Sequence, residues 1–223
     1  MVGRSRTRSA GVRRRRPYKG DLREEALLGT LERLLAEKPL ERIEVGELAR
    51  GAGISRPTFY FYFESKEAAL ARLAALVREE MYEAADAEPE EGLDPLEDIR
   101  MRIEATARLW REWGHVLRAA AQTWATEPNS RALYEEGIGR FVEGLRRKIL
   151  RMRRRGLAPE GPPEAEELAR ALVWMNERCF YASTLGSRVA PSEEELVDTL
   201  STIWYRAIYR GDPDSPSGPS CEA

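Results

Sequence analysis

The most constraining feature of the chain is residues 53–69, which read GISRPTFYFYFESKEAA. Ser55 is a residue type that caps helices, and Pro57 falls in the first turn of the helix that would follow, where no backbone donor is lost. The helix can extend only to about Phe63, because a break and a second capping serine follow it directly. On a 3.6-residue period Phe59 and Phe63 share one face, so the other bulky side chains point elsewhere. A two-turn helix of this kind is a poor structural element and suits insertion into a groove.

A second short helix is expected just upstream. Residues 45–50 form a helical stretch, Ala52-Gly53 provides a tight turn, and Ile54 can fill the space between the two helices. A helix, a glycine-containing turn and a second helix make the helix-turn-helix arrangement, whose second helix enters the DNA major groove. From Ala49 to Glu67 the chain reads Ala-x-x-x-Gly-Ile-Ser-x-x-Thr-x-Tyr-x-x-Phe-x-x-Lys-Glu. In this pattern residues 22–70 resemble the DNA-binding domain of the tetracycline-repressor (TetR) family.

The side chains of this segment suit DNA. Arg56 can form a bidentate pair with guanine, while Pro57 and Phe61 offer apolar contacts for a thymine methyl group. Lys66 opposes the dipole of the helix that it starts, and a bound phosphate would reverse that cost. The residues expected to contact DNA are Ser55, Arg56, Pro57, Thr58, Tyr60, Phe61, Tyr62 and Lys66. The chain departs from the family at Glu44 and Gly46, where members commonly carry a Ser or Thr cap and a basic residue.

Composition points to an all-α fold. Leu, Ala, Glu and Arg dominate, Val and Ile are sparse, and no alternating β pattern recurs, so about nine helices are expected, with one break at Gly114. The expected organisation is a disordered basic arm over 1–20, a three-helix DNA-binding domain over 21–66, a ligand-binding and dimerisation domain over 67–210, and a flexible tail over 211–223. The net charge of −2 combines an excess of Lys and Arg before residue 73 with an excess of Asp and Glu after it. This asymmetry indicates that one end of the molecule meets a polyanion.

The C-terminal helices carry large apolar side chains at helical spacings. A packed core is one interpretation of them. Asn176 favours a cavity, because a carboxamide on an apolar helix face needs a partner and its burial otherwise costs about 1–3 kcal/mol. The run Met175-Asn176-Glu177-Arg178 resembles one branch of the TetR family, which implies an elongated apolar cavity with this asparagine available to a ligand. The candidate ligand-binding residues are Trp110, Trp113, Tyr134, Ile138, Phe141, Val173, Asn176, Glu177, Phe180 and Trp204.

Motifs of catalysis are missing from the sequence. There is no Gly-rich phosphate loop, paired-histidine motif or nucleophile elbow, and the single histidine, His115, is expected to hydrogen-bond at a helix end. We therefore expect no enzymatic activity, no cofactor and no metal site. Two cysteines are too few for a disulfide framework, and no apolar run approaches the roughly 20 residues that span a bilayer. A cytoplasmic location is expected, with nucleoid association when the protein is bound to DNA.

These observations predict a ligand-responsive transcriptional repressor that binds double-stranded operator DNA and is released by an apolar small molecule. The resemblance implies a homodimer formed by the last two helices, with contributions from Trp174, Tyr181, Leu185, Leu196, Leu200, Ile203 and Ala207. The sequence does not separate a repressor from an activator. Two other interpretations stay open: an enzyme built on the helical body, and a lipid carrier or scaffold whose helix-turn-helix is vestigial.

Overall fold

The computed structural model describes residues 19–86, 92–124, 127–186 and 189–210, and all regular structure in these ranges is helical. The expected all-α class is confirmed. The expected arm, apart from its last two residues, and the expected tail lie outside the described ranges. Within the described ranges no helix is both long and apolar enough to cross a membrane. The elements are α1 (Lys19–Glu37), η1 (Leu40–Arg42), α2 (Val45–Gly51), α3 (Arg56–Tyr62), α4 (Lys66–Asp86), α5 (Pro95–Thr123), α6 (Pro128–Arg154), α7 (Ala165–Ser183), α8 (Glu193–Tyr205) and η2 (Arg206–Arg210).

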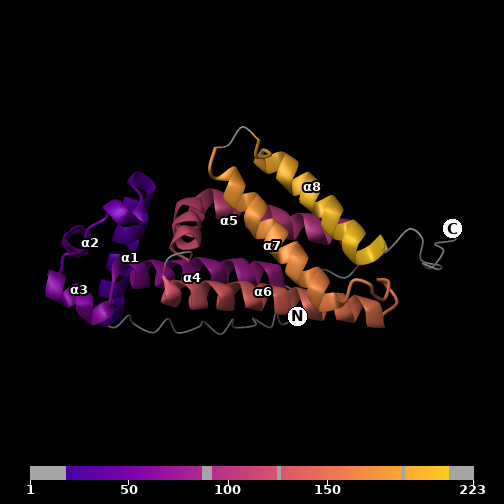
Figure 1. Ribbon diagram of the computed structural model, residues 1–223, viewed down its shortest axis with the longest axis horizontal. Coiled ribbons are helices and arrows are strands. Elements are labelled where there is room, and N and C mark those ends of the chain that lie inside the picture. Colours follow the sequence, from indigo (N-terminus) through magenta and orange to yellow (C-terminus); the bar gives the residue numbers. More distant parts are fainter. Residues whose placement is uncertain (1–18, 87–91, 125–126, 187–188, 211–223) are drawn as a thin grey trace, which may run out of the picture.

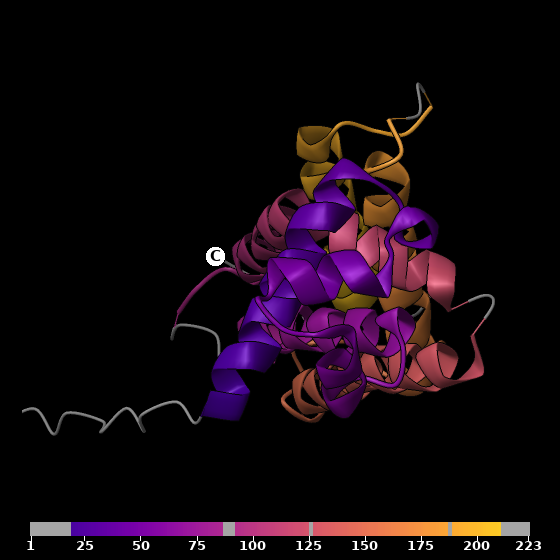
Figure 2. The same ribbon diagram turned by 90° about the vertical axis from the view of Figure 1, so that its left-hand side faces the viewer.

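The molecule is elongated, with its N-terminal helices at one end (Figure 1). We call α1–α3 the head and α5–α8 the body. Helix α4 leaves the head and runs lengthwise beside α6, while α7 and α8 cross over the far part of the body (Figure 1). Seen from the head end, α1–α3 lie in front of the body helices (Figure 2). One helix, α4, therefore belongs to both parts.

The head has a hydrophobic core that extends into the body. Leu31 of α1 and Phe59 of α3 are fully buried in it, and Val116 of α5 joins the same cluster. A second cluster holds α8 against α4 and α5 and includes Leu196 and Leu200, which are 2% and 1% exposed. These two leucines were expected at a dimer interface. They point into the protomer instead, because α8 needs an apolar face of its own to pack on the body.

The break expected at Gly114 does not exist, and α5 runs unbroken from Pro95 to Thr123. This fusion of two expected helices explains why eight α-helices are described and not about nine. A Cβ on Gly114 would lie only 3.1 Å from the Thr184 Cγ2 atom, and Arg118 donates to the Thr184 carbonyl at 2.9 Å. The glycine thus allows α5 to approach the end of α7. His115 lies mid-helix, where burial is the main cause that lowers its pKa.

Candidate functional site

The turn between α2 and α3 is built by glycine. Gly53 has φ 66°, a left-handed conformation that costs little without a Cβ, and the Ile54 amide donates back across the turn to the Ala49 carbonyl at 2.9 Å. Gly51 brings α2 close to α1, since a Cβ there would lie 2.3 Å from Thr30 Cγ2. Backbone geometry therefore fixes the angle between α2 and α3.

Helix α3 has one face inside the head. The Ser55 hydroxyl accepts the Thr58 amide at 3.3 Å and lies 2.7 Å from the Thr58 hydroxyl, which fixes the start of the helix. Phe59 and Phe63 are 0% and 8% exposed, with ring centroids 6.0 Å apart. This pair anchors α3 to the head, as the 3.6-residue period predicted.

The other face of α3 is presented to solvent. Phe61 is 83% exposed and Tyr60 is 48% exposed, so this face carries two aromatic side chains open to solvent. Arg56 and Pro57 are also exposed, while Thr58 and Tyr62 are half-buried. An outward ridge of cationic, aromatic and hydroxyl groups on a rigidly anchored helix has the geometry of a groove reader.

Lys66, the remaining residue expected at DNA, is engaged within the protein. Its ammonium donates to the carbonyl oxygens of Leu40 at 2.8 Å, Ile43 at 3.0 Å and Glu41 at 3.3 Å. These three bonds use all three donors of an ammonium group, so a phosphate contact would require releasing at least one of them. Lys66 therefore ties the first turn of α4 to η1, and its phosphate contact stays a prediction.

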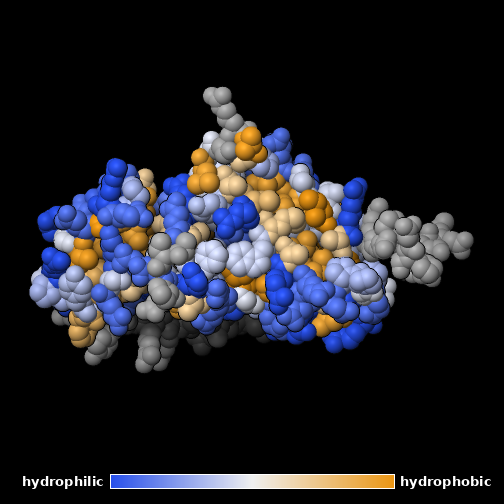
Figure 3. All heavy atoms as spheres, viewed as in Figure 1, coloured by the Kyte–Doolittle hydropathy of each residue, from blue (hydrophilic) through white to orange (hydrophobic). Residues whose placement is uncertain are grey.

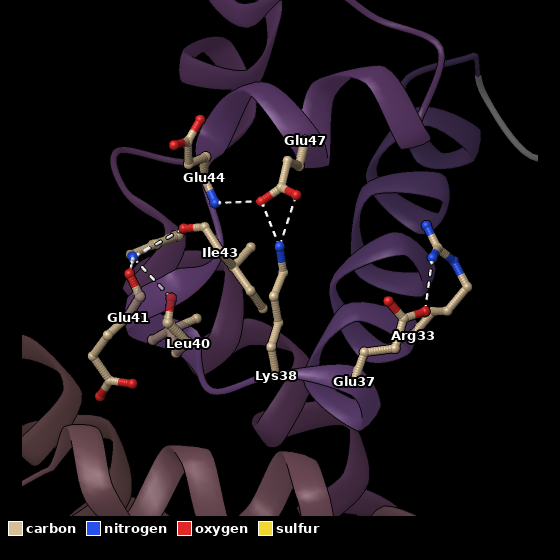
Figure 4. A network of polar contacts seen from close by, with 9 residues as sticks. Arg33, Glu37, Lys38, Leu40, Glu41, Ile43, Glu44 and Glu47 are labelled. Atoms are coloured by element: carbon tan, nitrogen blue, oxygen red, sulfur yellow. Dashed lines mark hydrogen bonds and ion pairs between the residues drawn. The ribbon is translucent and has the colours of Figure 1, made fainter.

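The start of α2 is held by two acidic residues, Glu44 and Glu47. Glu47 accepts the Glu44 amide at 2.9 Å and receives the Lys38 ammonium at 2.7 and 2.9 Å (Figure 4). The backbone bond and then the Lys38 bond lower the pKa of Glu47. This cluster joins the end of α1 to the start of α2 without help from DNA.

A cavity of about 170 Å³ lies in the body, bounded by α4, α5, α6, α7 and the C-terminal helical turns. Of the ten candidate ligand-binding residues, eight line it: Trp110, Tyr134, Ile138, Phe141, Val173, Asn176, Glu177 and Trp204. The other two do not. Phe180 is 1% exposed and stacks on Trp110, with centroids 6.3 Å apart. Trp113 packs between the head core and the neighbouring body cluster.

A polar group of residues interrupts the apolar wall of the cavity. The Tyr134 hydroxyl donates to Glu177 Oε1 at 2.5 Å, and the guanidinium of Arg78 lies 5.0 Å from the Tyr134 ring centroid. Burial lowers the pKa of Arg78, and burial followed by the Glu177 carboxylate raises the pKa of Tyr134. Tyr134 therefore stays protonated and acts as the donor in this pair.

Three buried polar atoms of the cavity wall have no hydrogen-bond partner among the described residues. They are Asn176 Oδ1, Glu177 Oε2 and Trp204 Nε1. Arg178 Nη2 lies 3.7 Å from Glu177 Oε2, which is beyond hydrogen-bond distance. Because leaving such atoms unsatisfied costs free energy, a ligand with matching donors and acceptors would be stabilised here.

Apart from Glu177, the charged residues of the cavity wall were not expected from the sequence. Arg78, Arg102, Lys148, Asp86 and Asp98 all line the cavity. Arg102 holds Asp98 at 2.7 and 2.9 Å, an i,i+4 pair that was readable from spacing on one helix. Lys148 on α6 contacts the end of α4, and no local spacing in the sequence predicts this contact.

Comparison with known proteins agrees with both parts of the structure. Residues 27–73 match the model of bacterial regulatory proteins of the tetR family, and residues 99–210 match the C-terminal domain of the transcriptional regulator EthR. The HTH-type transcriptional regulator EthR of Mycolicibacterium smegmatis is 36% identical over 210 residues, covering 94% of this chain and 96% of that protein. EthR of Mycobacterium tuberculosis H37Rv is 39% identical over 201 residues, covering 89% and 92%.

This chain belongs to the TetR family. It is a DNA-binding transcriptional regulator of the EthR type, and the family is not one of enzymes. Solved structures share the fold: a transcriptional regulator from Saccharomonospora viridis in complex with choline has a TM-score of 0.68 at 20% identity, covering 83% of this chain and 97% of that one. A TetR-family regulator from Syntrophomonas wolfei has a TM-score of 0.70 at 15% identity, covering 84% and 95%.

Proposed function

We propose that this TetR-family regulator is a homodimeric repressor, released from its operator when an apolar small molecule fills the cavity. The observation that carries the proposal is that α4 belongs to both the head and the body. Its first residue, Lys66, is bonded to the head, and its later turns supply Arg78, Met81 and Tyr82 to the cavity wall. An event in the cavity therefore acts directly on the helix that positions the head.

The outward face of α3 would meet the operator. Arg56 would pair with guanine, and Pro57, Thr58 and Phe61 would contact base edges such as the thymine methyl group. Ser55 and the hydroxyls of Tyr60 and Tyr62 would bind phosphates, with Lys66 nearby. Because a two-turn reader contacts few base pairs, tight and specific binding needs a second copy one helical turn away.

A stripe on α7 and α8 supports the dimer. Along α7 and just beyond its end, Ala171, Arg178 and Leu185 are exposed, and Trp174 and Tyr181 between them are half-buried, at spacings of three or four residues. Leu185 is 52% exposed, and Ile203 on α8 is 39% exposed. Apolar residues gather over α7 and α8 on this face of the molecule (Figure 3). A symmetric pairing of these helices would cover them, as isologous interfaces do.

The size of the cavity favours coupling between ligand and head. At about 170 Å³ it is smaller than the roughly 300–1,000 Å³ typical of ligand pockets. A larger ligand must therefore move a wall, and a ligand that binds the widened form better shifts the population toward it. A coupling free energy of about 1–3 kcal/mol would reduce operator affinity about 5- to 150-fold.

Substituting Asn176 tests the cavity. Asn176→Leu is expected to raise the concentration of an apolar carbonyl compound that half-releases operator DNA by about 5-fold or more, because one hydrogen bond to the ligand is lost. Fluorescence anisotropy of labelled operator DNA measures the release. Gln122→Leu makes the same kind of change at an exposed position of α5 and should leave release unchanged. Equal release curves for Asn176→Leu and the parent would refute the role of the cavity.

A further inference from the structure

The buried polar atoms of the cavity wall that lack partners form a specific set. Among the described residues of the wall they are two acceptors, Glu177 Oε2 and Asn176 Oδ1, and one donor, Trp204 Nε1. The two acceptors belong to α7 and the donor belongs to α8. A molecule that satisfies all three atoms must therefore offer two hydrogen-bond donors and one acceptor.

Glu177 places the strongest demand on such a molecule. Its side chain is 8% exposed, and its Oε1 atom accepts a hydrogen bond from the Tyr134 hydroxyl at 2.5 Å. Its Oε2 atom is buried without any hydrogen-bond partner among the described residues. Leaving a charged acceptor unsatisfied costs more free energy than leaving a neutral one. A donor at Oε2 would therefore contribute more to binding than a partner at either of the other two atoms.

The charge of Glu177 is balanced within the protein. Arg178 Nη2 lies 3.7 Å from Oε2, and the guanidinium of Arg78 lies 5.0 Å from the centroid of the Tyr134 ring. Burial lowers the pKa of Arg78, and first Tyr134 and then Glu177 oppose this shift, so Arg78 and Glu177 attract each other. Oε2 thus lacks a hydrogen bond and not a counter-charge. An uncharged N–H group would supply this bond without adding a third cation.

The two acceptors occupy adjacent positions on α7. Side chains at adjacent positions of a helix diverge by about 100°, because one turn takes about 3.6 residues. An NH2 group has two N–H bonds that point apart, so one such group can donate to both Asn176 and Glu177. A carbonyl oxygen in the same group would provide the acceptor for Trp204. A primary carboxamide combines these two donors and one acceptor in a single planar group.

We propose that the ligand is an apolar molecule with an uncharged primary carboxamide, whose NH2 group donates to Glu177 Oε2 and Asn176 Oδ1 and whose carbonyl accepts from Trp204 Nε1. This inference rests on the proposed function, because it names the chemical class of the molecule that fills the same cavity. The apolar and aromatic wall would hold the rest of the molecule.

Other polar groups of similar size fit the wall less well. A ketone or an ester has acceptors alone and leaves both oxygens of α7 without a donor. A carboxylate would in addition place a second negative charge beside Glu177. An ammonium group has donors alone, so it leaves Trp204 Nε1 unsatisfied and adds a cation beside Arg78 and Arg178. The carboxamide is the group among these that satisfies all three atoms.

Four probes with equal numbers of non-hydrogen atoms test the inference on the full-length protein without DNA: octanamide, 2-nonanone, octanoate and nonylammonium. They are short because the cavity measures about 170 Å³. Quenching of tryptophan fluorescence reports binding, since Trp110 and Trp204 line the cavity. Octanamide should bind about 10-fold or more tighter than 2-nonanone, in which a methyl group replaces the NH2 group. Failure of octanamide to bind, or equal or tighter binding of any other probe, would overturn the proposal.

Glu177→Gln tests the acceptor at Oε2. The Tyr134 hydroxyl can still donate to the remaining carbonyl oxygen, which turns the new NH2 group toward the ligand. Two donors would then face each other, so octanamide should lose its advantage over 2-nonanone, while 2-nonanone still binds. Glu135→Gln makes the same change at an exposed position of α6 and should keep the advantage. An undiminished advantage in Glu177→Gln would contradict the role of Oε2.

Trp204→Phe tests the donor on α8. It keeps an aromatic ring and removes the indole N–H, and Trp110 still reports binding. Octanamide and 2-nonanone share the carbonyl, so both should bind about 3-fold or more weaker, with the ratio of their affinities unchanged. Unchanged affinity for both probes would contradict the placement of the ligand carbonyl at Trp204.

Operator release distinguishes this inference from the proposed function. If octanamide binds with the expected preference but does not release operator DNA, the ligand assignment stands and the proposed regulation fails. If 2-nonanone releases operator DNA at concentrations as low as octanamide does, the regulation stands and the ligand assignment fails.

Discussion

Replacing Phe59 with alanine is expected to lower the free energy of unfolding by about 3–5 kcal/mol. The ring is 0% exposed and packs on Phe63 in the core that α1, α3, α4 and α5 share. Its removal leaves a cavity that the surrounding helices cannot fill, because α2 and α3 are fixed by the Gly53 turn. Chemical denaturation followed by circular dichroism measures the loss.

Phe61→Ala is the matched control, two residues away on the same helix. Its ring is 83% exposed, so stability should change by no more than about 0.5 kcal/mol. Operator binding should nevertheless weaken by about 1 kcal/mol or more, as for the loss of one base contact. A stable Phe59→Ala protein, or a Phe61→Ala protein that unfolds, would show that α3 presents the opposite face from the one described.

Introducing arginine at Leu185 and Ile203 together is expected to give a monomer and to weaken operator binding by about 10²–10⁴-fold, the gain that linking two binding modules provides. Leu185, just beyond the end of α7, is 52% exposed, and Ile203 on α8 is 39% exposed. In a symmetric interface each substitution appears twice, so like charges would be buried against one another. Sedimentation velocity gives the mass, and mobility shift gives the affinity.

Leu133→Arg provides the control for this pair. Leu133 is 46% exposed on α6, a different helix from the two that are expected to form the interface, so its substitution should leave the dimer and its DNA binding intact. Should the Leu185 and Ile203 double variant remain a dimer, the interface must lie elsewhere on the body.

The sequence predicted those features of the head that depend on local chemistry. The tight turn at Ala52-Gly53, the cap at Ser55 and the shared face of Phe59 and Phe63 all follow from residue type and helical period. Gly114 was misread because glycine usually weakens a helix, and nothing near it in sequence announces Thr184, whose side chain it must accommodate. The contact spans 70 positions, beyond the reach of a local rule.

The cavity was predictable only in part, for the same reason. Large apolar side chains and Asn176 at helical spacings pointed to an interior space, and eight of the ten candidates line one. Phe180 and Trp113 share those residue types but face other helices, a distinction that helix rotation sets and composition does not reveal. The ammonium groups of Lys66 and Lys148 likewise donate to carbonyls that are distant in sequence, those of η1 and of Ala85. Their surroundings come from the tertiary fold.

Selection of duplexes from a random DNA pool by the full-length protein, followed by sequencing, tests the central claim most directly. If paired α3 helices read the major groove, the selected duplexes should converge on an inverted repeat whose half-site centres lie about 10 base pairs apart, or a multiple of that spacing. Phe61→Ala should lose part of this enrichment while staying folded. Selection without any sequence convergence, or convergence on a single unrepeated site bound by a monomer, would contradict the account.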